Sequence, residues 1–223
     1  MARSAFSITA ATFTATAALL LTACGGGGGD SSSDDIKGAD TGAGSSSPSA
    51  SASGASDVKR PDVSLPDDLK LVFDFEKPSD ADQAAALEDA ANYIRALNHG
   101  ITEQDAKDPA YGFYSAAGAA RYAESQIEEY VAGGWTLTGE DRYYQAETNP
   151  VGDGEKARTI LVTFCEDQSK AYGKEVKTGE VHRTEESLAS YQRFSILMAP
   201  QEDPPVWRAQ QITVEGKAEE CRG

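Results

Sequence analysis

Apolar residues recur at helical spacing in two stretches of the chain. In the first, Ser79 is the expected N-cap and Gly100 is the expected end. The apolar positions between them are Leu87, Ala90, Ala91, Ile94 and Leu97. The second stretch covers 116–132 and ends at two glycines. The pattern therefore predicts two amphipathic helices, with a short turn over 102–107 between them.

After residue 134 the pattern becomes typical of β-strands, with β-branched and aromatic residues in place of the helical period. The predicted strands are 135–146, 157–166, 188–198 and 206–215. Helices followed by a run of antiparallel strands indicate an α+β domain, in which the helices pack on one face of a sheet. We expect this domain to cover 65–223, because about 160 residues suffice for one domain with one core.

The segment 24–64 consists mainly of Gly, Ser, Ala and Asp, with almost no large apolar residue. Such a composition buries too little apolar surface to offset the entropy lost on ordering. We therefore expect a disordered tether, and about 40 residues of this kind give an average reach of about 35 Å.

Residues 1–23 have the three parts of an export signal: a charged start at Arg3, an apolar run, and small residues before Cys24. The ending Leu21-Thr22-Ala23-Cys24 resembles a bacterial lipobox, in which the cysteine thiol receives a diacylglyceryl group after cleavage before it. Cys24 is thus the expected lipid-attachment site, fatty-acylated with chains such as palmitate. The expected location is the extracytoplasmic side of the cell membrane.

A plain secretory signal and a transmembrane helix are the alternatives for residues 1–23. The apolar run is shorter than the ~20 residues that a bilayer crossing needs. It is also interrupted by Thr9, Thr12, Thr14 and Thr16. Both observations favour the lipoprotein signal.

The chain is acidic, with 20 Lys plus Arg against 36 Asp plus Glu and a formal net charge of −16. Removal of residues 1–23 takes away Arg3 and makes this −17. Because such a surface repels phosphate backbones, we expect no nucleic-acid partner. The acidity is spread along the chain, so a solvated surface explains it better than a dedicated cation-binding face. The folded part has no phosphate- or dinucleotide-binding motif, and we expect no cofactor.

Two cysteines remain beyond Cys24, and an oxidising location outside the cytoplasm allows them to pair. We predict a disulfide between Cys165 and Cys221. The alternative is two unlinked buried thiols.

Several short motifs resemble those of exported actinobacterial lipoproteins with a nuclear transport factor two-like domain. They are Gly134-Trp135-Thr136-Leu137-Thr138-Gly139, Cys165-Glu166-Asp167-Gln168-Ser169, Lys177-Thr178-Gly179, and Trp207 near the start of a strand. The match covers about 66–221. It implies a cone, in which a strongly curved antiparallel sheet of four to six strands wraps two or three helices and leaves an open mouth lined by side chains.

Few residues in the sequence stand out for chemistry. The two histidines, His99 and His182, have no metal-ligand spacing, so no metal site is expected. In enzymatic relatives of the fold a pocket Asp or Tyr moves a proton next to a carbonyl, which makes Asp167 a candidate base. An Asx-turn with Ser169 is the alternative for Asp167. Candidate ligand-binding residues are Tyr93, Trp135, Asp167 and Trp207, although the aromatic ones are equally explained as core.

We prefer a non-enzymatic domain that binds a small apolar or aromatic ligand, or a protein partner. One alternative is a cyclase- or isomerase-type enzyme with Asp167 as base and a Tyr as oxyanion donor. The other is a structural homodimer. A cavity that holds Asp167 beside a Tyr favours the enzyme, whereas a filled cone excludes both ligand binding and catalysis.

Overall fold

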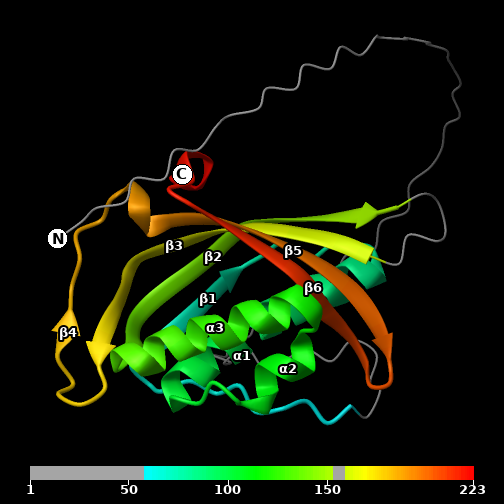
Figure 1. Ribbon diagram of the computed structural model, residues 1–223. Coiled ribbons are helices and arrows are strands. Elements are labelled where there is room, and N and C mark those ends of the chain that lie inside the picture. The colour runs from blue at the N-terminus through cyan, green and yellow to red at the C-terminus, as the bar shows by residue number, and fades with distance from the viewer. Residues whose placement is uncertain (1–57, 153–158) are drawn as a thin grey trace, which may run out of the picture. The chain divides into compact units, whose positions relative to one another are not determined.

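The computed structural model describes residues 58–152 and 159–223, within which three α-helices pack on one face of a six-stranded sheet (Figure 1). The helices are α1 (Ala81–Glu103), α2 (Pro109–Tyr114) and α3 (Ala117–Gly133). The strands are β1 (Leu69–Asp74), β2 (Trp135–Val151), β3 (Thr159–Glu175), β4 (Val181–His182), β5 (Tyr191–Glu202) and β6 (Pro205–Gly216). Two short 3₁₀ helices, η2 (Leu188–Ser190) and η3 (Glu219–Cys221), complete the described elements. The α+β class predicted from the sequence is confirmed.

The strand order is β1-β2-β3-β5-β6, with β4 paired to β3 beside this path. All pairs are antiparallel except β1 with β2, which run parallel, so the sheet is mixed rather than wholly antiparallel. The sequence analysis missed β1. Leu69, Leu71 and Phe73 do alternate along it, but its partner lies beyond three helices in the chain, and no local pattern reveals that pairing.

Strands β2 and β3 are longer than predicted because bulges interrupt their alternation without ending their ladder. The register shifts once between Glu140 and Arg142 and again between Tyr144 and Glu147. At the first shift, two residues of β3 lie opposite Asp141 alone. A bulge of this kind bends the strand and changes which side chains face the helices.

The ends of α1 differ from those predicted. Asp80 rather than Ser79 is the N-cap, and its side chain accepts a 2.9 Å hydrogen bond from the Gln83 backbone N–H. The helix also runs through Gly100, where α1 approaches Ile127 of α3 so closely that an added Cβ would lie 2.6 Å from Ile127 Cδ1. This close packing, rather than a helix end, accounts for the glycine. The end of α3 is as predicted: Gly134 follows it in the left-handed conformation, with φ 71°.

The core lies between the helices and the sheet face that they cover. Its largest fully buried members include Tyr93, Tyr143, Phe164 and Ile127. The segment before β1 belongs to this unit from residue 60 onward, since Arg60 forms an ion pair with the buried Asp89 of α1. Within the described residues, contacts with the domain thus include Arg60, five residues before the predicted boundary at Leu65.

The predicted signal (1–23), the lipid-attachment residue Cys24 and most of the tether lie outside the described residues. Within the part of the chain that the structure describes, no helix has the length and apolar character needed to span a membrane.

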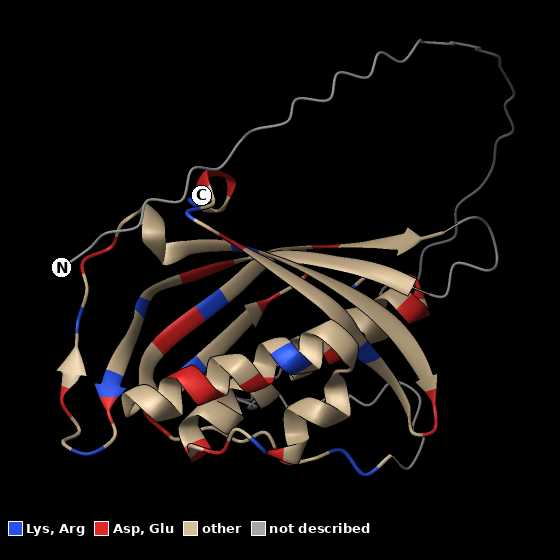
Figure 2. Cartoon of the chain, in the orientation of Figure 1, with Lys and Arg blue, Asp and Glu red and all other residues tan. Residues whose placement is uncertain are grey.

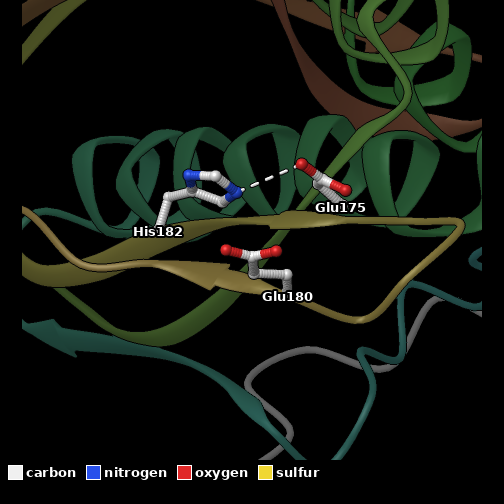
Figure 3. Close-up of side chains that lie close together, drawn as sticks. All are labelled: Glu175, Glu180 and His182. Carbon is white, nitrogen blue, oxygen red and sulfur yellow. Dashed lines mark hydrogen bonds and ion pairs between the residues drawn. The ribbon is translucent and has the colours of Figure 1, made fainter.

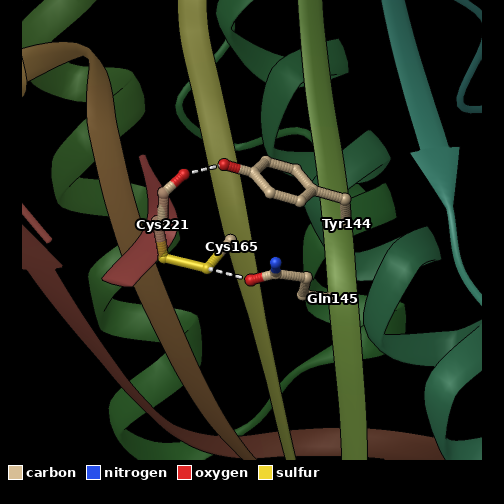
Figure 4. The surroundings of a disulfide bond; sticks show 4 residues. All are labelled: Tyr144, Gln145, Cys165 and Cys221. Carbon is tan, nitrogen blue, oxygen red and sulfur yellow. Dashed lines mark hydrogen bonds between the residues drawn. A yellow bond between two sulfur atoms is a disulfide. The ribbon is translucent and has the colours of Figure 1, made fainter. Parts of the chain in front are cut away.

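Cys165 and Cys221 form the disulfide expected from the sequence (Figure 4). Their Cα atoms lie 5.3 Å apart, and the bond fastens η3 to β3. Tyr144 donates its hydroxyl hydrogen to the Cys221 carbonyl, and Gln145 Oε1 lies 3.6 Å from Cys165 Sγ. These groups form a small buried cluster apart from the main core.

Candidate functional site

A cavity of about 200 Å³ lies between α1, α3 and the sheet. The polar side chains along its wall comprise two carboxyls, four phenols and four amides, and Lys, Arg and His are absent from its described lining. The carboxyls belong to Asp141 and Glu166; the phenols to Tyr122, Tyr130, Tyr143 and Tyr172; the amides to Asn98, Gln126, Gln168 and Gln192. This wall offers negative charge and hydrogen-bonding groups, with no basic side chain to balance them. By contrast, Figure 2 shows acidic and basic positions interspersed over the rest of the described chain.

Strand geometry brings Asp141, Tyr143 and Glu166 together. Asp141 and Tyr143 are two residues apart on β2 and therefore point to the same face of the sheet. Tyr143 is paired directly with Glu166 of β3, and its hydroxyl donates a 2.9 Å hydrogen bond to Asp141 Oδ2. The three side chains thus form one cluster on the helix-covered face.

Asp167 stabilises the bulge beside this cluster instead of entering it. Its Oδ1 accepts a 2.9 Å hydrogen bond from the Ser169 backbone N–H, which is the Asx-turn that the sequence analysis gave as the alternative. The turn lies where β3 has the extra residue opposite Asp141. Asp167 therefore helps to set the local register, and it is absent from the cavity lining.

Burial dominates the electrostatics of the acid pair. It raises the pKa of Asp141 from 3.8 to about 6, although the hydrogen bond from Tyr143 favours the ionised form. Burial together with the charge of Asp141 raises the pKa of Glu166 well above its usual value. Burial and mutual repulsion therefore favour a proton bound within the pair over two separate charges.

One oxygen of the pair has no hydrogen-bond donor outside the pair. Asp141 is only 7% exposed, and its Oδ1 is fully buried with no donor in the described structure other than the neighbouring Glu166 carboxyl, which hydrogen-bonds with Asp141 when one of the two is protonated. A buried carboxylate oxygen without a donor costs free energy, so such atoms are rare in native proteins. Because Asp141 lines the cavity, this oxygen is available to a hydrogen-bond donor that enters it.

The tyrosines around the pair remain protonated. Burial, then the charge of Glu166, raises the pKa of Tyr122 to about 12. The same two causes raise the pKa of Tyr130, to which Asp141 adds. These phenols can therefore donate hydrogen bonds, and their rings add apolar surface to the wall.

The residues predicted as ligand-binding lie elsewhere. Tyr93 is fully buried, and its hydroxyl donates to the Ala119 carbonyl. Trp207 is buried at the start of β6, and its backbone N–H donates to Asp89 Oδ2. Trp135 packs against the ring of His182. With Asp167 in its turn, none of the four lines the cavity.

Sequence reasoning missed Asp141 and Glu166, although a signal exists for each. Glu166 directly precedes Asp167, and strand alternation places only one of two such neighbours on the helix-covered face. Asp141 stands two positions before Tyr143, so strand alternation places its side chain on the same face as that of Tyr143. The deciding fact, which face points inward, depends on the bulges and on the packing of α1 and α3.

A second cluster lies at the end of β3, where Glu175, Glu180 and His182 offer ligand atoms within 4.8 Å of one another (Figure 3). His182 Nε2 lies 3.2 Å from Glu175 Oε1, and its ring packs edge-on against Trp135. Glu180 and His182 are exposed. The contact with Glu175 and the ring contact with Trp135 account for the position of His182.

No protein-family model matches the chain, and no curated protein matches it significantly. Among solved structures it is similar to an NTF2-like protein of unknown function in nutrient uptake from Rhodospirillum rubrum, with 16% identity, a TM-score of 0.36, and coverage of 56% of this chain and 96% of that chain. It is also similar to the intermembrane space region of the chloroplast protein ARC6, with 10% identity, a TM-score of 0.35, and coverage of 58% and 96%. Values of this size carry no inference about activity or ligand.

Proposed function

We propose that this domain binds a small polar organic molecule in the cavity between α1, α3 and the sheet, and that Cys24 anchors the chain on the outer side of a cell membrane. The observation that carries the binding role is the carboxyl of Asp141, buried at the cavity wall with one oxygen unpartnered. A ligand with a hydrogen-bond donor that enters the cavity would satisfy this oxygen, whose burial is otherwise costly.

The wall carries more polar groups than the small apolar or aromatic ligand expected from the sequence would need, and it supports a polar ligand. Ten of the side chains along it carry a polar group, and the phenols and amides come from helices and strands alike. Rigid elements hold these groups in place before the ligand arrives, which lowers the ordering cost of binding. The amide and phenol groups can both donate and accept, as recognition of a polar molecule requires.

Native mass spectrometry of the full chain purified from its own host tests the binding role. We expect a retained small molecule in the wild type and in Asp167→Asn, and none in Asp141→Asn. Asp167→Asn is the matched control, because it removes an acid from the same part of the sheet but outside the cavity. Equal retention by both variants would contradict the proposal. The subunit number in the same spectrum tests the homodimer hypothesis.

The anchoring role is supported by the lipobox-like sequence that ends at Cys24. Cys24→Ser removes the thiol that would carry the lipid. We expect the wild-type chain in the membrane fraction and the variant in the soluble fraction, with a mass difference that matches the acyl groups. A wild-type chain with a free thiol at this position would refute the anchor.

A second candidate function is proton transfer on a bound substrate. It is favoured by the proximity of a proton-holding acid pair to the Tyr143 hydroxyl, since a general acid or base works best with a pKa near the operating pH. The small molecule retained in the native mass spectrum distinguishes binding from catalysis. An enzyme converts it to a product on incubation, and Asp141→Asn does not, whereas a binding protein returns it unchanged.

A further inference from the structure

We infer that the ligand is a small organic ammonium ion, with its protonated nitrogen at Asp141 and its apolar body against the tyrosine rings of the cavity. This inference rests on the proposed function and specifies its ligand class. It depends on three features of the site: uncompensated negative charge, an unpartnered acceptor, and aromatic walls.

The only charged side chains in the described lining are the two carboxyls, on β2 and β3. Asp141 and Tyr143 contribute from β2, and Glu166 and Tyr172 from β3. Helix α3 adds only the phenols of Tyr122 and Tyr130, whereas α1 and β5 contribute no titratable group to the described lining. Outside the lining, Asp167 adds further negative potential at the pair. The described lining therefore attracts a cation at the acid pair on β2 and β3, and no element of it offers a positive charge to an anion.

The basic residue nearest in sequence does not supply the missing counter-charge. Arg142 follows Asp141 on β2 and points to the opposite face, where it donates a 2.7 Å hydrogen bond to Asp74. Its guanidinium also lies over the ring of Tyr144. No basic side chain in the described lining balances the charge of the pair, so a bound cation would be its counter-charge.

The unpartnered oxygen specifies a donor. Asp141 Oδ2 already accepts from Tyr143, and Oδ1 has no donor outside the acid pair, although the carboxyl is only 7% exposed. An N–H⁺ group satisfies both the hydrogen-bonding capacity and the charge, and charge-assisted hydrogen bonds are about twice as strong as neutral ones. A neutral hydroxyl supplies the hydrogen bond but leaves the negative charge unbalanced.

The aromatic rings suit the rest of such a molecule. Tyr122, Tyr130 and Tyr172 line the cavity together with Phe194, and electron-rich ring faces attract organic cations. The rings also bury an apolar body, which a strongly hydrated inorganic cation lacks. The wall therefore favours an organic ammonium ion over a metal ion.

Three probes of similar shape test this assignment on the full chain by isothermal titration calorimetry near neutral pH. Benzylamine carries the charge and the N–H⁺ donor, benzyl alcohol carries a donor without charge, and benzyltrimethylammonium carries the charge without a donor. We expect benzylamine to bind at least about tenfold more tightly than benzyl alcohol, with benzyltrimethylammonium between them. Equal affinities of the amine and the alcohol would overturn the ammonium assignment but leave ligand binding in place. Failure of all three to bind, with no retained molecule in the native mass spectrum, would instead refute the proposed function.

Variants test whether the probe binds in the cavity. We expect Asp141→Asn to lose about tenfold or more of the benzylamine affinity and little of the benzyl alcohol affinity, whereas the control Asp167→Asn, which lies outside the lining, loses much less of the benzylamine affinity. Glu166→Gln leaves Asp141 charged and is expected to retain the preference for the amine, provided that near-ultraviolet circular dichroism shows a native fold. Should Asp141→Asn be misfolded, chemical-shift changes of Tyr122 and Tyr130 in wild-type protein on adding benzylamine serve instead. Unchanged benzylamine affinity in Asp141→Asn would overturn the inference. So would binding to the wild type without chemical-shift changes at Tyr122 and Tyr130.

Discussion

The Tyr143 hydroxyl donates a 2.9 Å hydrogen bond to Asp141 Oδ2, two residues away on the same strand and inside the cavity. The Tyr143 ring stacks on Phe73, with centroids 4.7 Å apart, and meets Phe164 edge-on. These contacts hold the Tyr143 ring in place, and the hydrogen bond from its hydroxyl orients the Asp141 carboxyl. Asp141 is therefore held ready for a ligand by side chains that belong to the core.

Asp141→Asn should stabilise the protein at alkaline pH and have little effect at acidic pH. Burial raises the pKa of Asp141 from 3.8 to about 6, so the folded protein binds this proton more tightly than the unfolded chain does. The stabilising contribution is complete below about pH 4 and is lost as the pH rises through 6. The full shift corresponds to about 3 kcal/mol, which the variant should recover near pH 8.

Thermal and urea unfolding of the two proteins between about pH 4 and pH 8 measure this difference. The control Asp167→Asn should show no comparable gain at alkaline pH, since Asp167 is engaged in its turn with Ser169. A constant difference between wild type and Asp141→Asn over this range would show that Asp141 ionises at the same pH in the folded and unfolded states.

Benzylamine affinity should fall as the medium is acidified. Its amine stays protonated over this range, so the change reports the site. Protonation of Asp141, with its pKa of about 6, removes the charge that holds the ligand, and the affinity at about pH 5 should be about tenfold below that at pH 7.5. Calorimetry in buffers of different ionisation enthalpy should show nearly one proton released per molecule bound near pH 5, and almost none at pH 7.5. A pH-independent affinity would remove Asp141 from the contact.

Much of this architecture is readable from local patterns. Helices α1 and α3 follow from their apolar stripes, and the end of α3 from Gly134. The disulfide follows from a count of cysteines once an exported location is assumed. These features depend on neighbours in the sequence or on composition, which is why one chain suffices to predict them.

The site is harder to predict because it depends on which strand face points inward. Asp167 and Glu166 are adjacent, yet only Glu166 reaches the cavity. The bulge opposite Asp141 shifts the alternation, and the parallel strand β1 comes from a segment far away in the chain. Register and long-range pairing are tertiary properties, so the acid pair emerges only when the sheet and the helices are placed together.

Arg60→Ala should destabilise the domain although Arg60 lies outside its predicted boundary. Arg60 pairs with Asp89, which is 2% exposed and also accepts a 2.8 Å hydrogen bond from the Trp207 backbone N–H. Removing the cation leaves a buried carboxylate with no counter-charge. We expect a loss of about 2 kcal/mol in unfolding free energy, less than for a fully buried pair because the Arg60 side chain is 39% exposed.

The matched control for Arg60→Ala is Lys70→Ala. Lys70 pairs with Glu140 on the surface, where both side chains are exposed, and its loss should change the unfolding free energy by less than about 0.5 kcal/mol. Urea unfolding measures both variants. Equal changes in unfolding free energy for the two variants would mean that the contact between Arg60 and Asp89 does not stabilise the domain in solution.

Gly139→Ala should be strongly destabilising. Gly139 has φ 100°, and an added Cβ would lie 2.1 Å from the Lys170 carbonyl oxygen. Backbone strain and this clash together should lower the unfolding free energy by about 3 kcal/mol. Gly112→Ala in α2 is the control, because nothing lies within 4 Å of its added Cβ, and it should be neutral or slightly stabilising. Similar melting temperatures for the two variants would contradict the strained conformation of Gly139.

Loss of the disulfide should weaken the fold but spare the cavity. Cys165 precedes Glu166 on β3, so it points to the opposite face of the sheet, where it lies with Tyr144 and Tyr191 in the small cluster around Cys221. The bond closes a loop with a sequence separation of 56 residues, for which the chain-entropy relation gives about 4 kcal/mol.

In a Cys24→Ser background, replacing both remaining cysteines by Ala should lower the unfolding free energy by about this amount and leave benzylamine affinity within about twofold at a temperature where the variant is folded. Reduction of the parent protein should reproduce the shift in melting temperature. An unchanged melting temperature on reduction would contradict the bond, and a lost affinity in the folded variant would show that the two faces of the sheet are coupled.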